Sequence, residues 1–149
     1  TTLLERSGAL VATHSDAASR VHQLVSASSE ILSKLQTNFS PTPARAHCTF
    51  GVRSFLRMLQ GLCSLKRFDH SPPLLCLGRL WFHETSRCWG DGLPDAEDRV
   101  WLSEQLLECS TQISGQPKEM VLMKDGLFFQ HAVGRTDYHE VADTATFKA

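Results

Sequence analysis

Prolines and glycines divide this sequence into four stretches that carry the apolar repeat of an α-helix, and this division constrains the fold more than any other feature. Proline breaks a helix because it lacks a backbone N–H, and it pushes the preceding residue into an extended conformation. Pro41 and Pro43 follow the first stretch, Pro72-Pro73 opens the third, and Gly90 closes the third. The sequence therefore predicts separate helices joined by short connections.

The four stretches place apolar side chains three and four residues apart, a spacing that gathers them on one helix face. We expect helices at 16–36, 52–65, 72–90 and 95–115. Their predicted inner faces carry Ala17, Val21, Leu24, Val25, Leu32 and Leu35; then Val52, Phe55, Leu56, Leu59, Leu62 and Cys63; then Leu74, Leu77, Leu80, Trp81, Thr85, Cys88 and Trp89; and finally Trp101, Leu102, Leu106, Cys109 and Ile113. The predicted fold is mainly α, a small bundle of about four helices. An irregular C-terminal tail follows, with one candidate short strand at 127–129.

Composition narrows the possible partners. A chain of 149 residues is about one domain, and its 15 basic and 16 acidic side chains leave a net charge of −1. Such a balance carries no electrostatic footprint for nucleic acid or an acidic membrane surface, and no apolar run is long enough to span a bilayer. The five cysteines form no C-x-x-C pair, so we expect reduced core residues in a soluble intracellular protein.

Catalytic and metal-binding patterns are incomplete. The sequence contains no phosphate-binding G-x-x-x-x-G-K-[ST], no G-x-G-x-x-G and no G-x-S-x-G elbow. His83-Glu84 begins a zinc-protease H-E-x-x-H, but Arg87 stands where the second histidine belongs. Cys76, His83 and Cys88 are spaced so that a helix turns them to different faces. We therefore predict no catalytic residue and no metal ligand, and expect His83 and Glu84 to serve an internal hydrogen-bond network.

Arg53 is the candidate binding residue. It lies in the first turn of the second predicted helix, where unpaired N–H groups already create a positive potential. A cation there is unfavourable by a few tenths to about 1 kcal/mol, and a nearby anion would reverse the sign. Two interpretations follow from the residues alone: a solvated arginine that bends away from the helix end, or an anion-binding arginine.

Two blocks of the sequence resemble signatures of dynein heavy chains. The block "PTPARAHCTFGVRSFLRMLQGL" at 41–62 is similar to P-T-P-A-K-S-H-Y-T-F-N-L-R-D followed by a helix that ends in Q-G. The block "RLWFHETSRCWGDGLPDAEDRVWL" at 79–102 is similar to R-L-W-x-H-E-x-x-R-V-F-x-D-R-L-x-x-x-x-D-r-x-W. The matching residues are Pro41, Thr42, Pro43, Ala44, His47, Thr49, Phe50, Arg53, Gln60, Gly61, Arg79, Leu80, Trp81, His83, Glu84, Arg87, Asp91, Leu93, Asp98 and Trp101. A fainter likeness reaches Tyr138–Val141.

The resemblance implies the helical lid of the third AAA+ unit in a dynein motor ring, running toward the fourth. Residues 1–38 would connect the large AAA+ subdomain to the lid, 39–115 would form the lid, and 116–149 would link to the next unit. Arg53 would face nucleotide phosphate. ATP or ADP would be bound by the parent protein, and the fragment alone would bind no cofactor and hydrolyse no ATP. Adjacent AAA+ subdomains would be its direct partners, and microtubules and other dynein subunits would be partners of the parent, in the cytoskeleton of a cilium or flagellum axoneme.

The sequence departs from the dynein pattern at the start of the second helix. The family's asparagine is Gly51, its aspartate is Ser54, its tyrosine is Cys48, and the arginine of its D-R-L is Gly92. Glycine caps a helix less well than asparagine by a few tenths of a kcal/mol, and Ser54 removes a negative charge. These departures predict a divergent member whose third unit binds nucleotide weakly or serves structurally.

A second hypothesis comes from another class of protein. The aromatic residues of the third and fourth predicted helices and the unmatched tail also suit an independent helical adaptor that binds a partner through an apolar groove. Phosphate-binding and ATPase motifs upstream in the full-length protein would favour the motor, whereas an unrelated domain there would favour the adaptor.

Overall fold

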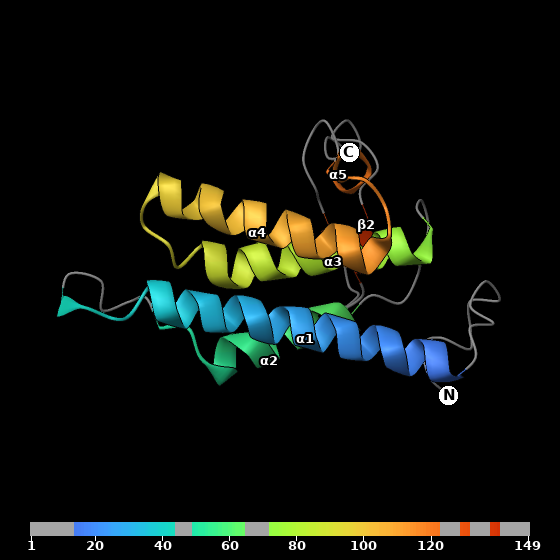
Figure 1. The fold of residues 1–149 in the computed structure, drawn as a ribbon, viewed down its shortest axis with the longest axis horizontal. Coiled ribbons are helices and arrows are strands. Elements are labelled where there is room, and N and C mark those ends of the chain that lie inside the picture. Colours follow the sequence, from blue (N-terminus) through green and yellow to red (C-terminus); the bar gives the residue numbers. More distant parts are fainter. Residues whose placement is uncertain (1–13, 44–48, 65–71, 123–128, 132–137, 141–149) are drawn as a thin grey trace.

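The computed structural model describes residues 14–43, 49–64, 72–122, 129–131 and 138–140 (Figure 1). The fold is mainly α, as the sequence predicts. Its elements are α1 (His14–Asn38), α2 (Val52–Cys63), α3 (Pro73–Thr85), the π-helix η2 (Ser86–Gly90), α4 (Ala96–Ser114), α5 (Lys118–Val121), β1 (Phe129–His131) and β2 (Tyr138–Glu140). None of the helices in these ranges is long and apolar enough to cross a membrane.

Helix boundaries follow the prolines and glycines. Helix α1 ends at Asn38, ahead of Pro41, and α3 has Pro73 in its first turn, where a missing N–H removes no helix hydrogen bond. Helix α4 ends at Gly115, whose φ of 65° lies in the left-handed region and whose N–H donates to Thr111 O. The predicted end of α3 at Gly90 is also present, but the last turn before it is the wider π-helix η2.

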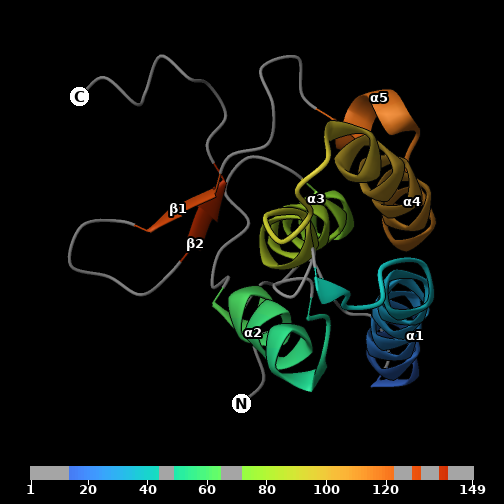
Figure 2. The same cartoon turned by 90° about the vertical axis from the view of Figure 1, so that its left-hand side faces the viewer.

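Helices α1 to α4 form a bundle. Figure 2 looks along the helices and shows α3 between α2 and α4, with α1 closing the fourth side. Helices α3 and α4 approach closely because small residues line their contact. Ser110 Oγ donates to Gly78 O at 2.8 Å, and a Cβ atom placed on Gly78 would lie 3.0 Å from Ser114 Cβ.

The core lies where the four helices meet. Its largest fully buried side chains are Trp81 and Trp89, and both indole N–H groups have hydroxyl acceptors. Trp101 is partly buried, and its ring meets Phe39 edge to face with centroids 5.5 Å apart. The predicted placement of these three tryptophans on the inner faces of their helices is therefore confirmed. The principal core cluster consists of Leu24, Ile31, Leu35, Phe39, Met58, Trp81, Trp89, Leu93, Leu102, Leu106, Cys109 and Ile113.

The predicted inner face of α1 is wrong in part. Val21 and Val25 are 59% and 39% exposed, whereas Ser28 and Ile31 are fully buried. The face that packs on the bundle runs through Leu24, Ser28, Ile31 and Leu35, and a stripe drawn through apolar residues alone misses the buried serine.

The predicted inner face of α2 is also too broad. Val52 and Leu56 are 71% and 52% exposed, and Cys63 is exposed rather than part of the core. Met58, outside the predicted stripe, is fully buried. Helix α2 packs on α3 and η2, and these two neighbours cover only one side of its apolar surface.

The C-terminal part contains more regular structure than predicted. Arg79, only 8% exposed, donates from Nε and Nη2 to Met120 O at 3.1 and 2.6 Å, and so holds α5 against α3. Strands β1 and β2 pair antiparallel, with Phe129 opposite Glu140. The predicted strand is present from Phe129 onward, while its first two residues, 127 and 128, lie outside the described ranges, as do Cys48 and His47.

Candidate functional site

The N-terminus of α2 is the candidate site because it carries Arg53. The N-cap residue is Gly51, whose backbone is extended with φ at −150°. The Phe55 N–H donates to Gly51 O at 3.2 Å and makes the first hydrogen bond of the helix. Glycine has no side chain, so the usual side-chain acceptor for the first turn is missing, as the sequence predicts.

Ser54 supplies part of what the N-cap residue lacks. Its hydroxyl accepts the Gly51 N–H at 3.3 Å and donates to Gly51 O at 2.8 Å. This is half of a capping box, in which the third helical residue reaches back to the N-cap. The same oxygen also accepts the Trp89 indole N–H at 3.1 Å. The hydroxyl therefore uses its one donor and both acceptor positions, so Ser54 orients the helix start although it carries no charge.

The chain entering α2 is fixed by the end of α1. Gln36 Nε2 donates to Phe50 O at 2.9 Å. The Phe50 ring meets the Phe39 ring edge to face, with centroids 6.4 Å apart. Gly92, which stands where the dynein pattern has arginine, also lies against the Phe50 ring, since a Cβ atom there would be 3.7 Å from it. Residues from α1 and from the loop before α4 thus meet at the start of α2.

Arg53 lies in the middle of this arrangement and points into solvent. It is exposed, and it makes no hydrogen bond or ion pair with the residues that the structure describes. Arg57 lies one turn further along α2 and is also exposed. No acidic residue occupies the first turn of α2 to offset these charges. The first turn of α2 therefore carries positive charge without an acidic side chain of its own, and such a helix start favours an anion.

Arg57 was not among the predicted site residues. Its position four residues after Arg53 places both side chains on one side of the helix. This spacing is the sequence signal that could have identified Arg57 as part of the site. Burial raises the pKa of the Cys88 thiol in η2, and Arg57 is one of the charged groups near that thiol, together with Arg87, Glu84 and Asp91.

His83 and Glu84 lie in a separate structural cluster. The Glu84 side chain is fully buried, and its Oε2 accepts Arg87 Nη2 at 2.8 Å. His83 Nε2 lies 3.9 Å from Glu84 Oε1. The Glu84 carboxylate packs directly on Gly61 of α2, where no side chain would fit beside it. Within the described ranges no three histidine, cysteine or acidic residues come together as metal ligands.

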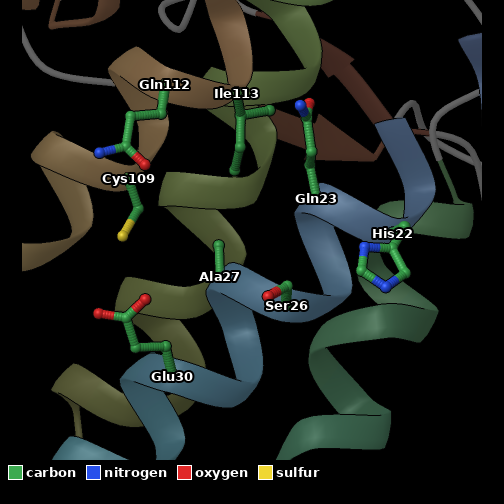
Figure 3. A pocket seen from close by; sticks show the side chains of 8 residues that line it. All are labelled: His22, Gln23, Ser26, Ala27, Glu30, Cys109, Gln112 and Ile113. Atoms are coloured by element: carbon green, nitrogen blue, oxygen red, sulfur yellow. The ribbon is translucent and has the colours of Figure 1, made fainter. Parts of the chain in front are cut away.

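A shallow groove between α1 and α4 was not predicted from the sequence. Its volume is about 240 Å³ (Figure 3). Burial and the nearby Glu30 carboxylate raise the pKa of the Cys109 thiol at its wall, so this thiol stays protonated. The lining residues are His22, Gln23, Ser26, Ala27, Glu30, Cys109, Gln112 and Ile113. None of them belongs to the two sequence blocks that resemble dynein.

Comparison with known proteins decides the family. Residues 7–99 match the family model described as Dynein heavy chain, ATPase lid domain, and this match covers more than half of the chain. The chain belongs to this dynein family. The chain is 41% identical over 81 residues to dynein axonemal heavy chain 12 of Rattus norvegicus, and this alignment covers 54% of the chain and 3% of the relative.

Other relatives give the same result at lower identity. The chain is 34% identical over 100 residues to dynein axonemal heavy chain 3 of Homo sapiens, and this alignment covers 67% of the chain and 2% of the relative. It is 30% identical over 126 residues to dynein axonemal heavy chain 17 of Homo sapiens, covering 83% of this chain and 3% of the relative. The chain is thus a divergent member of the family, and its alignments span only 2 to 3% of these relatives. No solved structure matches it significantly.

Proposed function

We propose that this dynein lid senses nucleotide for the third AAA+ unit of a heavy chain and relays the nucleotide state toward the fourth. Residues 1–38 join it to the large subdomain, 39–115 form the lid, and 116–149 lead to the next unit. The names of the axonemal relatives support a parent that is an ATP-driven microtubule motor in the axoneme of a cilium or flagellum. Membership of the ATPase lid family supports contact with other AAA+ subdomains of the same chain.

The observation that carries this proposal is the positive start of α2, whose first turn contains no acidic residue. Arg53 is exposed there, beside free helix N–H groups and without an acidic neighbour in the first turn. A bound phosphate would supply the missing negative charge and would accept a charge-assisted hydrogen bond from the guanidinium. The departures from the dynein pattern do not remove this arrangement, because Ser54 still orients the helix start.

The relay follows from the packing of the bundle. ATP or ADP in the neighbouring large subdomain favours the lid orientation that brings Arg53 to the phosphate, and loss of phosphate removes that preference. The four helices share one core, so a rotation of α2 carries α3 and α4 with it. In this scheme the lid hydrolyses no ATP itself, and its partners are the adjacent subdomains of the same heavy chain.

A nucleotide titration tests the role of Arg53. The third large subdomain and this lid would be expressed as one polypeptide, and ATP and ADP affinities would be measured for the wild type and for Arg53→Ala. Loss of a hydrogen bond to a charged group costs about 1.5 to 3 kcal/mol, so we expect the affinity to fall by roughly 10- to 150-fold.

Arg20→Ala is the matched control. Arg20 is also an exposed helical arginine, but it lies in α1 and donates only to Gln23 within the described residues. Its removal is expected to leave the affinity unchanged. Equal affinities for the wild type and Arg53→Ala would show that Arg53 is an ordinary surface charge.

A further inference from the structure

We propose that Trp89 is a positioning residue for Arg53, acting through Ser54. The indole N–H of Trp89 holds the Ser54 hydroxyl in the orientation that caps α2, and Arg53 is the residue immediately before Ser54. The inference deepens the proposed function and rests on it for the role of Arg53. The hydrogen-bonded connection itself stands on the geometry of the described residues.

The connection runs between two elements that are far apart in sequence. Trp89 lies in η2 at the end of α3 and is fully buried, and Ser54 lies in the first turn of α2, 35 residues earlier. The segment η2 contacts both α2 and α4. A one-turn π-helix changes the direction in which the side chains of its last residues project, and such turns are frequent at functional sites. Trp89 therefore links the orientation of α3 to that of the α2 start.

The start of α2 depends on this link because its own capping is incomplete. Gly51 offers no side-chain acceptor, and the first turn contains no carboxylate. The Ser54 hydroxyl can rotate about its Cβ–Oγ bond, and the indole N–H occupies one of its two acceptor positions. The remaining acceptor position then faces the Gly51 N–H, while the hydroxyl hydrogen faces Gly51 O. An external donor thus fixes a cap that the local sequence leaves loose.

The charge of the capping residue decides whether an outside donor is needed. Ser54 is neutral, and the Trp89 indole N–H reaches its hydroxyl at 3.1 Å. A carboxylate at the same third helical position would cap the helix start and charge it without such a donor.

Backbone amide hydrogen exchange on the folded chain tests the link directly. The amides of Gly51 and Phe55 report on the cap, since they donate to Ser54 Oγ and to Gly51 O. Trp89→Phe keeps most of the ring and removes the donor. Loss of a helix cap corresponds to about a 3- to 30-fold change, so exchange at both amides should accelerate by that factor. Ser54→Ala keeps the indole ring in the core but leaves its N–H without this acceptor, and it should accelerate exchange at both amides similarly, should Trp89→Phe fail to fold.

Trp81→Phe is the matched control. Trp81 is equally buried, but its N–H donates to Ser28 of α1, so its loss should affect the α2 start no more than the rest of the bundle. The double variant Trp89→Phe with Ser54→Asp supplies a carboxylate that caps without an outside donor, so exchange at Gly51 and Phe55 should return to within about 2-fold of the wild type. A packing role for the indole would not predict this rescue.

The outcomes separate the two proposals. The positioning role is overturned if exchange at the α2 start of Trp89→Phe matches that of the Trp81→Phe control. It is also overturned if Ser54→Asp does not restore slow exchange in the double variant. Accelerated exchange with rescue supports it. The same variants are then titrated with ATP as one polypeptide with the large subdomain. If exchange changes and is rescued while nucleotide affinity stays constant in these variants and in Arg53→Ala, the link stands and the nucleotide-sensing function fails.

Discussion

Replacement of Ser28 by alanine should destabilise the bundle far more than the same change at the next residue. The Trp81 indole N–H donates to Ser28 Oγ at 2.8 Å, and both side chains are fully buried. Alanine would leave that N–H without an acceptor in the core, at a cost of about 1 to 3 kcal/mol. The better helix propensity of alanine returns about 0.5 kcal/mol. The expected net loss in the free energy of unfolding is about 0.5 to 2.5 kcal/mol.

Ser29→Ala provides the control, since Ser29 is exposed in the same helix and gains the same propensity without losing a buried partner. We expect it to be stabilised by about 0.5 kcal/mol, so the two variants should differ by about 1 to 3 kcal/mol. At roughly 2 to 4 °C for each kcal/mol, thermal midpoints should differ by several degrees. Urea unfolding followed by far-ultraviolet circular dichroism measures both variants without relying on tryptophan fluorescence.

A double-mutant cycle isolates the hydrogen bond. Once Trp81→Phe has removed the donor, Ser28→Ala should cost no more than Ser29→Ala, because no unsatisfied group remains. Equal stabilities of Ser28→Ala and Ser29→Ala in the otherwise unchanged chain would refute the reasoning that a buried indole N–H depends on this serine.

Two further predictions concern packing and thiol chemistry. In Gly61→Ala, overlap with the Glu84 carboxylate should lower the free energy of unfolding by about 1 to 3 kcal/mol, and the better helix propensity of alanine should offset about 1 kcal/mol of this loss. Gly90→Ala is the control because it has room for a methyl group, and urea unfolding compares the two variants. In a variant with the cysteine at position 48 replaced by serine, the Cys63 thiol should react with a disulfide reagent at pH 8 well before the Cys109 thiol. Cys63 is exposed, whereas Cys109 is buried and its pKa is raised. Equal reaction rates of the two thiols would contradict this order.

Helix boundaries could be predicted because their causes are local. Pro41, Pro73 and Gly115 act through their own backbone conformations, and the structure ends or begins helices beside them. The buried faces could be predicted only in part. Val25 and Val52 satisfy the apolar repeat but remain exposed, because burial depends on which neighbouring helix covers each face.

The candidate site shows the same limit. The position of Arg53 in the first turn of α2 follows from residues close to it in sequence, and the structure agrees. The hydrogen bond from Trp89 to Ser54 could not be predicted from the sequence. It depends on a π-helix that no local pattern indicates and on a contact between residues 35 positions apart. Ser54, where the dynein pattern has aspartate, therefore predicts a weakened helix start, whereas the donor that orients Ser54 is the Trp89 indole N–H in η2.

The close crossing of α3 and α4 at Gly78 determines how far a small movement can be carried. Ser110 and Ser114 fill the contact and leave little space at Gly78, so we expect α3 and α4 to move as one rigid pair. Helix α4 has 19 residues and is therefore about 28 Å long. A tilt of about 10° at one end would displace the other by about 5 Å, close to one helical turn. In the relay proposed above, a small rotation at the α2 start would thus become a larger displacement at the far end of α4.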